Sequence, residues 1–462
     1  MSWTFTAIGG GKEIGANSYL LKMDGVPLLL DAGLHPKKYG LESLPDFGLI
    51  DRELEAIFIS HSHLDHVGAL PVVSRSHPQA PIFATIPTKD IAIRMLHNTV
   101  TVMNIFREEK GIKDYPFFEH EDLWPLEEEM IGLEFKGPGS GLSSRNRIQS
   151  ERLHIRGGIE ARFIPAGHVL GAAGLLLRQE GRHLFYTGDI SLQDQAIIAG
   201  AIVPDADIDT LVMECTYAND AEYYSRNREG EIKSFAAAAS EVLSRGGCVL
   251  IPAFALGKTQ ELLHIIHRLI RERRLPSVPL YLSGLGKSIT EIYQEHIRYL
   301  RPQASALTFE LFSVLQYLDD LAIRELLLEP SIIVATNGMM VENTPSARLA
   351  RWMVREERHG IFFCGYIDPD TLGYLVFHSN PGDSIAFDPD DEPVTVVNSN
   401  IRRFYLSSHA DRSELLELAR RVRPKKVVLV HGEEAGMEFM KRELGGEMEV
   451  FIGEKGRTIH LG

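Results

Sequence analysis

The sequence predicts a layered α/β fold in which one domain is interrupted by a second, inserted α/β domain. Three observations support this prediction. Short β-branched or apolar runs end in polar residues, which is typical of buried strands followed by loops. Helical patterns lie between these runs, as at 259–273 and 412–424. Polar stretches rich in Pro or Asp, at 202–209 and 387–394, are typical of domain borders and enclose a strand and helix series of their own.

The length of the chain agrees with this organisation. With 462 residues it exceeds one ordinary domain, since about 100 to 200 residues per domain would give two or three. We expect residues 1–205 and 396–462 to form one domain, and residues 206–395 to form the insertion. The sequence has no internal repeat, and its Gly/Ser-rich segment 137–147 is predicted to be an exposed or mobile loop.

Five of the predicted strands end in residues that can carry chemistry. In chain order they are 26–33 (VPLLLDAG), 54–63 (LEAIFISHSH), 183–191 (HLFYTGDIS), 210–218 (TLVMECTYA) and 425–433 (KKVVLVHGE). The segment from 206 to 395 adds the runs 247–254, 279–284, 331–338 and 360–368. The helical pattern at 412–424 stops at Pro424, because proline cannot continue a helix. The basic run 420–426 at this point is typical of a solvated helix end, with an RNA contact as the alternative.

Composition places the chain among ordinary water-soluble proteins. Apolar residues make up 44% and charged residues 24% of it. No apolar run approaches the roughly 18 residues needed to cross a bilayer, so we expect no membrane association. The N-terminus has no basic region followed by a hydrophobic stretch, which argues against a secretory signal. The sequence therefore predicts a cytoplasmic protein.

Cysteine and charge counts exclude several kinds of site. Cys215, Cys248 and Cys364 are odd in number and far apart, so they predict neither a disulfide framework nor a thiolate zinc cage. The net charge of −15 excludes a wholly basic nucleic-acid surface, although a local basic groove or bound cations could still bind phosphates. The 18 histidines are a supply of neutral nitrogen ligands.

The strongest local signal is the segment HSHLDH directly after a predicted strand. It contains His61, His63, Asp65 and His66 within six residues. The turn at the end of a strand can fold alternate side chains together, so these four can converge on one or two metal ions.

Three further candidate ligands lie downstream at comparable positions. His168 lies in a glycine-rich loop, while Asp189 and His431 each end a predicted strand. Taken singly, His168 and His431 are more typical of hydrogen-bonded structural histidines. Together with the HSHLDH segment they make seven imidazole and carboxylate donors, which suits a site with two metal ions.

These motifs resemble those of the metallo-β-lactamase superfamily. HSHLDH matches its HxHxDH signature, and the matching aspartates and histidine stand in LLLDAG (Asp31), AGHVLGAAG (His168) and YTGDIS (Asp189). Three more segments resemble the additional motifs of the β-CASP family of RNA-processing nucleases, which includes ribonuclease J and the cleavage and polyadenylation endonuclease subunit. They are ECTYA with Glu214, SSHADRSELLELA with His409 and VVLVHGE with His431. The resemblance covers nearly the whole chain.

The resemblance implies an αββα sandwich with an inserted β-CASP cap that forms an active-site cleft. It implies that His61, His63 and His168 hold one zinc ion and that Asp65, His66 and His431 hold a second. Asp189 would bridge the two ions, and manganese is an alternative metal. Asp31 would orient the ligands by hydrogen bonds, as metal sites generally need. A simpler role for Asp31, capping a strand-to-loop turn, stays open beside it.

The implied chemistry is hydrolysis of RNA phosphodiesters, either endonucleolytic or 5′-exonucleolytic. Two divalent cations can neutralise the phosphate and activate a water. The leaving oxygen then needs a proton, and His409, which completes neither ligand set, is the candidate general acid. Glu214 would accept a hydrogen bond from His409 and stabilise its protonated form. His409, Glu214, Asp65 and Asp31 are therefore the predicted catalytic residues.

Several alternatives stay open at this point. The chain could process DNA, or it could be a non-catalytic RNA-processing scaffold, although such scaffolds lose ligands that this chain retains. In the β-CASP family a histidine at the position of His431 goes with RNA-processing members, so single-stranded RNA is the expected partner. Departures from the family pattern at Val341–Asn343 and at Asp370 affect the expected grip on the substrate. The oligomeric state is open, with a homodimer among the alternatives.

Overall fold

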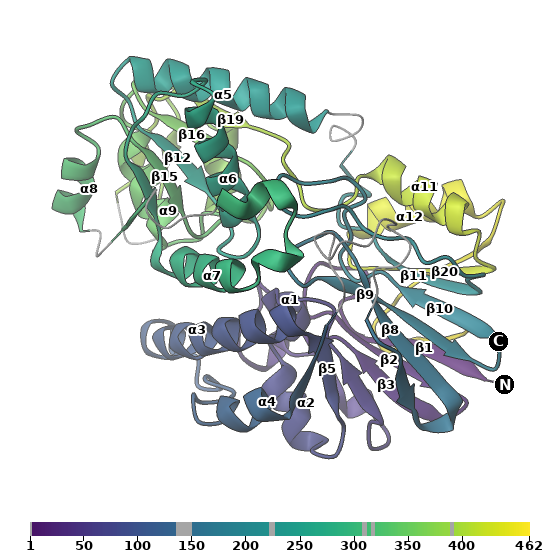
Figure 1. Cartoon of the computed structure of the whole chain (residues 1–462). Coiled ribbons are helices and arrows are strands. Elements are labelled where there is room, and N and C mark those ends of the chain that lie inside the picture. Colours follow the sequence, from purple (N-terminus) through teal and green to yellow (C-terminus); the bar gives the residue numbers. More distant parts are fainter. Residues whose placement is uncertain (1, 135–149, 221–226, 307–311, 316–318, 389–391) are drawn as a thin grey trace. The chain divides into compact units, whose positions relative to one another are not determined.

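The computed structural model describes residues 2–134, 150–220, 227–306, 312–315, 319–388 and 392–462 (Figure 1). The predicted loop 137–147 lies outside these residues. The chain divides into two compact units. The first unit contains residues 1–224, 298–302 and 409–462, and the inserted unit contains residues 225–297 and 303–408. Both mix strands and helices, so the predicted α/β class is confirmed.

The borders of the units differ from those expected from composition. Sequence places them near residues 205 and 395, whereas the compact units divide at 224/225 and 408/409. Strand β11 (Thr210–Glu214) explains the first difference, because it pairs in parallel with β10 (Arg182–Tyr186) and β20 (Lys426–Val430) inside a sheet of the first unit. A polar stretch therefore precedes β11, the last strand of the first unit before the insertion, instead of ending this part of the unit.

The first unit contains two seven-stranded sheets. The order of the first sheet is β22-β1-β2-β3-β4-β5-β6 and that of the second is β21-β20-β11-β10-β9-β8-β7. Apart from β10, β11 and β20, their strands are β1 (Trp3–Gly9), β2 (Ser18–Met23), β3 (Val26–Leu30), β4 (Ala56–Phe58), β5 (Ile82–Thr85), β6 (Met130–Leu133), β7 (Leu153–Ile155), β8 (Ile159–Pro165), β9 (Ala173–Gln179), β21 (Glu449–Ile452) and β22 (Thr458–His460). Phe58 of β4 lies edge-on to Phe163 of β8, with ring centroids 6.2 Å apart, so the inner faces of the two sheets pack together.

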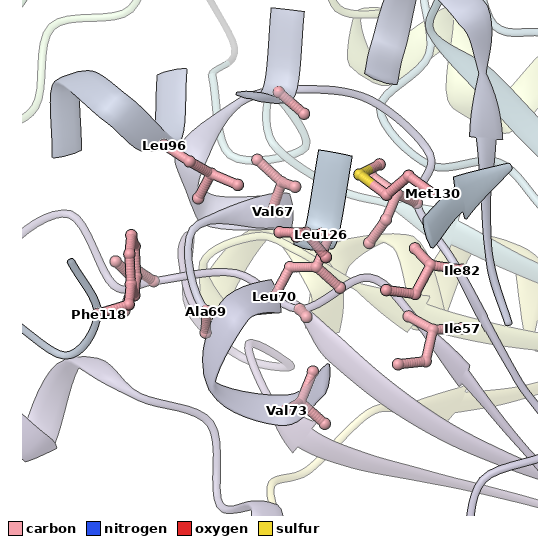
Figure 2. Close-up of a cluster of buried hydrophobic side chains, with 14 of the residues drawn as sticks. Ile57, Val67, Ala69, Leu70, Val73, Ile82, Leu96, Phe118, Leu126 and Met130 are labelled. Carbon is pink, nitrogen blue, oxygen red and sulfur yellow. The ribbon is translucent and has the colours of Figure 1, made fainter. Parts of the chain in front are cut away.

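Helices α2 (Leu70–Ser76), α3 (Ile86–Lys110) and α4 (Leu123–Glu129) cover the outer face of the first sheet. The side chain of Thr85 caps the start of α3 by accepting from the backbone N–H of Thr88, and Gly111, with φ 68°, ends it in the left-handed conformation. Figure 2 shows part of the core beneath these helices, in which Leu70 and Leu126 share one buried cluster with Ile57 of β4 and Ile82 of β5. Burial of these side chains holds the helices on the sheet.

Helices α11 (Arg412–Val422) and α12 (Glu434–Leu444) pack on the second sheet, beside β11 and β20 (Figure 1). Asp411 and Glu414 form a reciprocal capping box that starts α11. The helix ends at Val422, and Arg423 after it takes the left-handed conformation, directly before Pro424 where the sequence predicts the stop. Leu415 and Leu418 of α11 then pack in one cluster with Met213 of β11.

The inserted unit is built on a six-stranded parallel sheet of order β14-β13-β15-β12-β16-β19. Its strands are β12 (Val249–Pro252), β13 (Leu280–Leu282), β14 (Ser313–Val314), β15 (Ile332–Ala335), β16 (Gly360–Phe363) and β19 (Ile401–Arg403). Its helices are α5 (Arg228–Ser244), α6 (Lys258–Arg271), α7 (Gly284–Glu295), α8 (Asp320–Leu326), α9 (Pro345–Met353) and α10 (Leu372–His378). A two-stranded sheet, β17 (Ser384–Ile385) with β18 (Val394–Thr395), completes the unit. Among the described residues, no helix has the length and hydropathy required to span a bilayer.

Candidate metal centre

The ends of four strands in the first unit bring the candidate ligands together. Strands β8, β10 and β20 run in one direction through the second sheet, so their carboxyl ends meet at one edge. His168, Asp189 and His431 lie in the loops that follow these strands, and the HSHLDH turn follows β4 of the other sheet. Gly33 allows that turn to pack closely, because a Cβ at this position would fall 1.7 Å from the backbone oxygen of Asp65.

The first cluster consists of His61, His63, His168 and Asp189, whose ligand atoms all lie within 4.8 Å of one another. His63 Nδ1 lies 3.0 Å from His61 Nε2 and 3.1 Å from His168 Nε2. Asp189 Oδ2 lies 3.5 Å from His61 Nε2 and 3.7 Å from His168 Nε2. Three imidazole nitrogens and one carboxylate oxygen therefore face a common point.

The second cluster consists of Asp65, His66 and His431, again with ligand atoms within 4.8 Å of one another. Asp65 Oδ2 lies 3.2 Å from His431 Nε2 and 3.7 Å from His66 Nε2. Asp189 joins this cluster to the first one, because its other oxygen, Oδ1, lies 3.3 Å from His66 Nε2. The two oxygens of this one carboxylate thus face different clusters.

These donors fit metal ions in their spacing and in their hydrogen bonding. Tetrahedral zinc with Zn–N bonds of about 2.0 to 2.1 Å separates its nitrogen ligands by about 3.4 Å, close to the spacing around His63 Nδ1. Asp189 Oδ1 is buried and accepts no hydrogen bond of good geometry from a described group, although His431 Nδ1 lies 3.1 Å away. A buried carboxylate oxygen without a donor is what a cation would satisfy.

The charge balance of the clusters also suits a cation. Burial lowers the pKa of His61 and of His63, which favours the neutral imidazoles that bind metals. At His66 burial acts in the same direction, but the carboxylates of Asp189 and Asp65 outweigh it and raise the pKa. Protons on the histidines therefore balance the charge of the buried carboxylates. Divalent cations can replace these protons, because metal binding releases protons from the ligands.

Asp31 lies behind the second cluster and accepts hydrogen bonds from three side chains. Its Oδ2 lies 2.8 Å from His66 Nδ1 and accepts from Ser60 Oγ at 2.8 Å and from Tyr186 Oη at 2.6 Å. Its Oδ1 accepts from the backbone N–H of Ser60 at 2.7 Å. The residue is fully buried. This arrangement fixes the ring of His66, so the orienting role predicted for Asp31 has a structural basis.

Other supporting side chains were not anticipated from the motifs. Asn17 Nδ2 lies 3.0 Å from His66 Nε2, and Tyr19 donates to Asn17 Oδ1 at 2.9 Å. Thr216 Oγ1 lies 3.0 Å from His431 Nδ1. Ser60 and Tyr186 directly adjoin the motifs HSHLDH and TGD, which is the one sequence signal that pointed to them. Thr216 lies within the motif ECTYA, two residues after Glu214, whereas Asn17 and Tyr19 carried no such signal.

His409 and Glu214 form a third group beside the first cluster. A nitrogen of His409 and an oxygen of Glu214 lie within 4.8 Å of each other and of an oxygen of Asp189. The His409 ring centroid is 4.4 Å from that of His168. Burial lowers the pKa of His409, but the carboxylate of Glu214 more than offsets this and raises it overall. All ten site residues that the sequence singles out in this unit are therefore brought together, nine of them in the three groups and Asp31 directly behind His66.

The remaining segments that the sequence singles out lie elsewhere. Val341–Asn343 and Asp370 belong to the inserted unit and join none of the three groups. In the basic run 420–426, Arg420 pairs with Glu447 at 2.9 Å and Lys425 with Asp209 at 2.6 Å, as a solvated helix end would.

Three family models match separate parts of the chain. The model described as "Metallo-beta-lactamase superfamily" matches residues 11–85, and the "Beta-Casp domain" matches residues 259–375. The "Zn-dependent metallo-hydrolase RNA specificity domain" matches residues 395–452, which contain His409 and His431. Metal binding at the His and Asp clusters agrees with these matches.

Relatives match over nearly all of this chain. "Cleavage and polyadenylation specificity factor subunit 3" of Dictyostelium discoideum is 30% identical over 456 residues, which cover 95% of this chain and 54% of that protein. "Endoribonuclease YSH1" of Saccharomyces cerevisiae is 28% identical over 464 residues, covering 96% of this chain and 56% of the relative. The chain thus spans about half the length of the curated relatives it matches.

A solved structure supports the fold, and only the fold. A protein of unknown function from Enterococcus faecalis matches with a TM-score of 0.56 and 16% identity, covering 100% of both chains. Its similarity concerns architecture only, whereas two of the family models match segments that contain cluster residues, namely 11–85 and 395–452. On these matches the chain belongs to the β-CASP family of the metallo-β-lactamase superfamily.

Proposed function

We propose that this chain is a metal-dependent ribonuclease that hydrolyses phosphodiester bonds of RNA. The observation that carries the proposal is the position of the His409–Glu214 pair beside two groups of metal-ligand side chains that share Asp189. Two of the matches support RNA as the substrate class. They are the RNA specificity domain matched by residues 395–452 and the endoribonuclease name of the yeast relative.

Under this proposal two zinc ions bind in the first unit. His61, His63 and His168 would hold one ion, Asp65, His66 and His431 would hold the other, and Asp189 would contribute to both sites. When bound, such ions neutralise phosphate charge and activate water as a nucleophile. Seven donors exceed the number that one tetrahedral zinc site uses, which supports two ions.

The protein side chains then supply position and protons. Asp31 holds His66 through its Nδ1, so that the opposite nitrogen faces the second cluster. Glu214 accepts a hydrogen bond at His409 Nδ1, which leaves the proton on Nε2 for transfer to the leaving oxygen of the substrate. The raised pKa of His409 favours the protonated form that a general acid needs.

We propose endonucleolytic cleavage as the primary activity, with 5′-exonucleolytic cleavage as the alternative. The test is product mapping on one RNA of defined sequence, labelled either at its 5′ or at its 3′ end. Labelled fragments of intermediate length, seen with the 5′ label and with the 3′ label, support endonucleolytic cleavage. Mononucleotides released first from the 5′-labelled RNA would support the exonuclease instead. If the metal-loaded protein yields no products from either RNA, the ribonuclease proposal is wrong.

A further inference from the structure

The second sheet of the first unit exposes part of its outer face to solvent. Helices α11 and α12 bury Ile164 of β8 and Phe185 of β10 in their shared cluster with the sheet. Further along the same face, one row of side chains crosses four strands. The strand registers place His154, Glu160, Arg178 and His183 opposite one another in that order. All four are exposed or half-buried.

A second row lies beside the first and carries two arginines. Arg162 of β8 stands opposite Leu176 of β9, and Arg152 precedes β7 on the other side of Arg162. Glu160 joins the rows, because it pairs with Arg152 at 3.0 Å and with Arg178 at 3.4 Å. Arg152, His154, Arg162, Arg178 and His183 are called the basic sheet face below. Its three arginines stand beside a single glutamate, so among these four residues the positive charges exceed the negative by two.

This concentration of charge contributes little to the stability of the fold. Like charges on neighbouring strands destabilise a sheet, and burial, together with the charge of Arg152, lowers the pKa of Arg162. Exposed ion pairs such as those of Glu160 stabilise a fold by only about 0 to 1 kcal/mol. The whole chain carries a net charge of −15, so a local basic excess runs against its composition. A surface of this kind is complementary to an anionic partner.

The basic sheet face includes Arg162 of β8, the strand that leads to the candidate metal centre. Strand β8 runs from Glu160 through Arg162 to Pro165, three residues before His168. At about 3.3 Å per residue, Arg162 is about 10 Å from the end of β8. A flexible anionic polymer held at this face can therefore extend to the metal centre of the same unit.

We propose that the basic sheet face is a second contact surface for single-stranded RNA, which holds the phosphate backbone outside the metal centre. The inference rests on the proposed ribonuclease function for its choice of partner. Guanidinium groups bind phosphate oxygens in bidentate geometry, and Glu160 holds two of these groups in place. In the basic run at 420–426, by contrast, Arg420 and Lys425 each pair with a separate carboxylate, whereas Arg152 and Arg178 share one.

The test compares two double variants with the same change in charge. Arg162→Gln with Arg178→Gln changes the basic sheet face. The control, Arg421→Gln with Lys441→Gln, changes exposed residues of α11 and α12. Binding of a long single-stranded RNA is measured across salt concentrations, with His409→Ala added to all proteins to suppress cleavage. We expect about 10-fold weaker binding for the face variant at low salt, and a salt slope shallower by about 0.7 for each phosphate that the protein no longer neutralises. The control should keep the slope of the parent.

The outcomes separate this inference from the proposed function. With His409 intact, the face variant should cleave long RNA more slowly and cleave a dinucleotide as the parent does. An equal loss of RNA affinity in the face variant and the control, or no loss of affinity in either, would overturn the inference. If binding falls as expected but no variant or parent cleaves RNA, the surface stands and the ribonuclease proposal fails. If the double variant folds poorly, Arg178→Gln alone can replace it, because the Arg178 side chain is half-exposed. Changing Arg162 and Arg178 to Lys instead of Gln should restore part of the affinity for RNA.

Discussion

His409 Nδ1 lies 3.0 Å from one carboxylate oxygen of Glu214 and 3.1 Å from the other. Glu214 is 1% exposed and also accepts hydrogen bonds from the backbone N–H groups of Ile190, at 2.7 Å, and Thr216, at 3.2 Å. Ile190 directly follows Asp189, so the carboxylate that orients His409 is itself anchored to the loop between the metal clusters. His409 is therefore held beside the clusters by a partner that belongs to neither of them.

The first prediction separates proton transfer from metal binding. His409→Ala should keep its metal and lose most of its turnover, by about 10²- to 10⁴-fold, the usual contribution of a general acid. His63→Ala should lose metal as well as activity, because His63 Nδ1 is the central nitrogen of the first cluster. Elemental analysis and turnover of both variants provide the comparison.

A substrate whose leaving group needs no proton gives the control for this prediction. An aryl phosphodiester with a good leaving group should be cleaved by His409→Ala almost as well as by the parent protein. The general-acid role is wrong if His409→Ala slows cleavage of this substrate as much as it slows cleavage of RNA. It is also wrong if the zinc content of the variant falls in proportion to its activity.

The second prediction concerns metal content. Protein purified without added metal should contain about two zinc ions per chain, since seven donors converge on two points. Removing the ions with a chelator should lower the melting temperature, because a ligand that binds only the folded state stabilises it. Elemental analysis and thermal unfolding measure the two effects. A fully active protein with one ion or none would contradict the dinuclear arrangement.

The sequence predicts the residues of the site better than the contacts that support it. His61, His63, Asp65 and His66 are adjacent in one turn, and Asp189 and His431 each follow an apolar run that forms a strand. Such local patterns are readable without a structure. Tyr186 is different, because its contact with Asp31 crosses from β10 of one sheet to the end of β3 in the other. Only the packing of the sheets places these two residues together.

The basic sheet face is even harder to predict from the sequence than the contact between Tyr186 and Asp31. Arg152, Arg162 and Arg178 lie in separate segments, and each is ordinary for a strand position. They form a surface only through the registers of β7, β8 and β9. The borders of the compact units lie away from the polar stretches for a related reason, because β11 pairs with β10 and β20 after the stretch at 202–209.

The third prediction tests the support that Tyr186 gives to the second cluster. Tyr186→Phe removes the donor that lies 2.6 Å from Asp31 Oδ2, and should weaken zinc binding by about 10-fold, as removal of such supporting groups commonly does. Zinc affinity is measured by competition with a coloured chelator. Tyr293→Phe is the matched control, because Tyr293 is equally buried but lies in the inserted unit. Equal affinities of the two variants would show that Tyr186 only fills space.

The fourth prediction uses a buried lysine of the inserted unit. Burial, helped by the charge of Arg228, lowers the pKa of Lys258 from 10.5 to about 8, and its Nζ donates to the backbone oxygen of Leu406. Between these two values the unfolded chain binds more protons than the folded one, so the free energy of unfolding rises with pH. The whole effect corresponds to about 3 kcal/mol.

Lys258→Met isolates this contribution, because other titrating groups are common to both proteins. Urea unfolding at pH values from below 8 to near 10.5 should show the parent gaining stability relative to the variant as the pH rises. A constant difference between the two proteins across this range would mean that Lys258 keeps an ordinary pKa in the folded state.

The last prediction is that single-stranded RNA is cleaved in preference to DNA. The 2′-hydroxyl is the group by which a protein distinguishes the two at a given site. The net charge of −15 opposes long-range capture of a stiff, densely charged duplex, so affinity should depend on a few phosphates at the metals and on local basic groups. The salt dependence of binding should therefore be shallow.

Matched single-stranded RNA, single-stranded DNA and duplexes of one sequence, compared at several salt concentrations, provide the measurement. Single-stranded RNA should have the highest kcat/KM at each salt concentration. Because the loss of affinity with salt scales with the number of phosphates neutralised, a shallow slope for RNA would also limit how many phosphates the protein binds. Equal or faster cleavage of DNA, and of duplex DNA above all, would favour a DNA-processing member of the β-CASP family, since a preference for duplex cannot arise from a weakly basic surface alone.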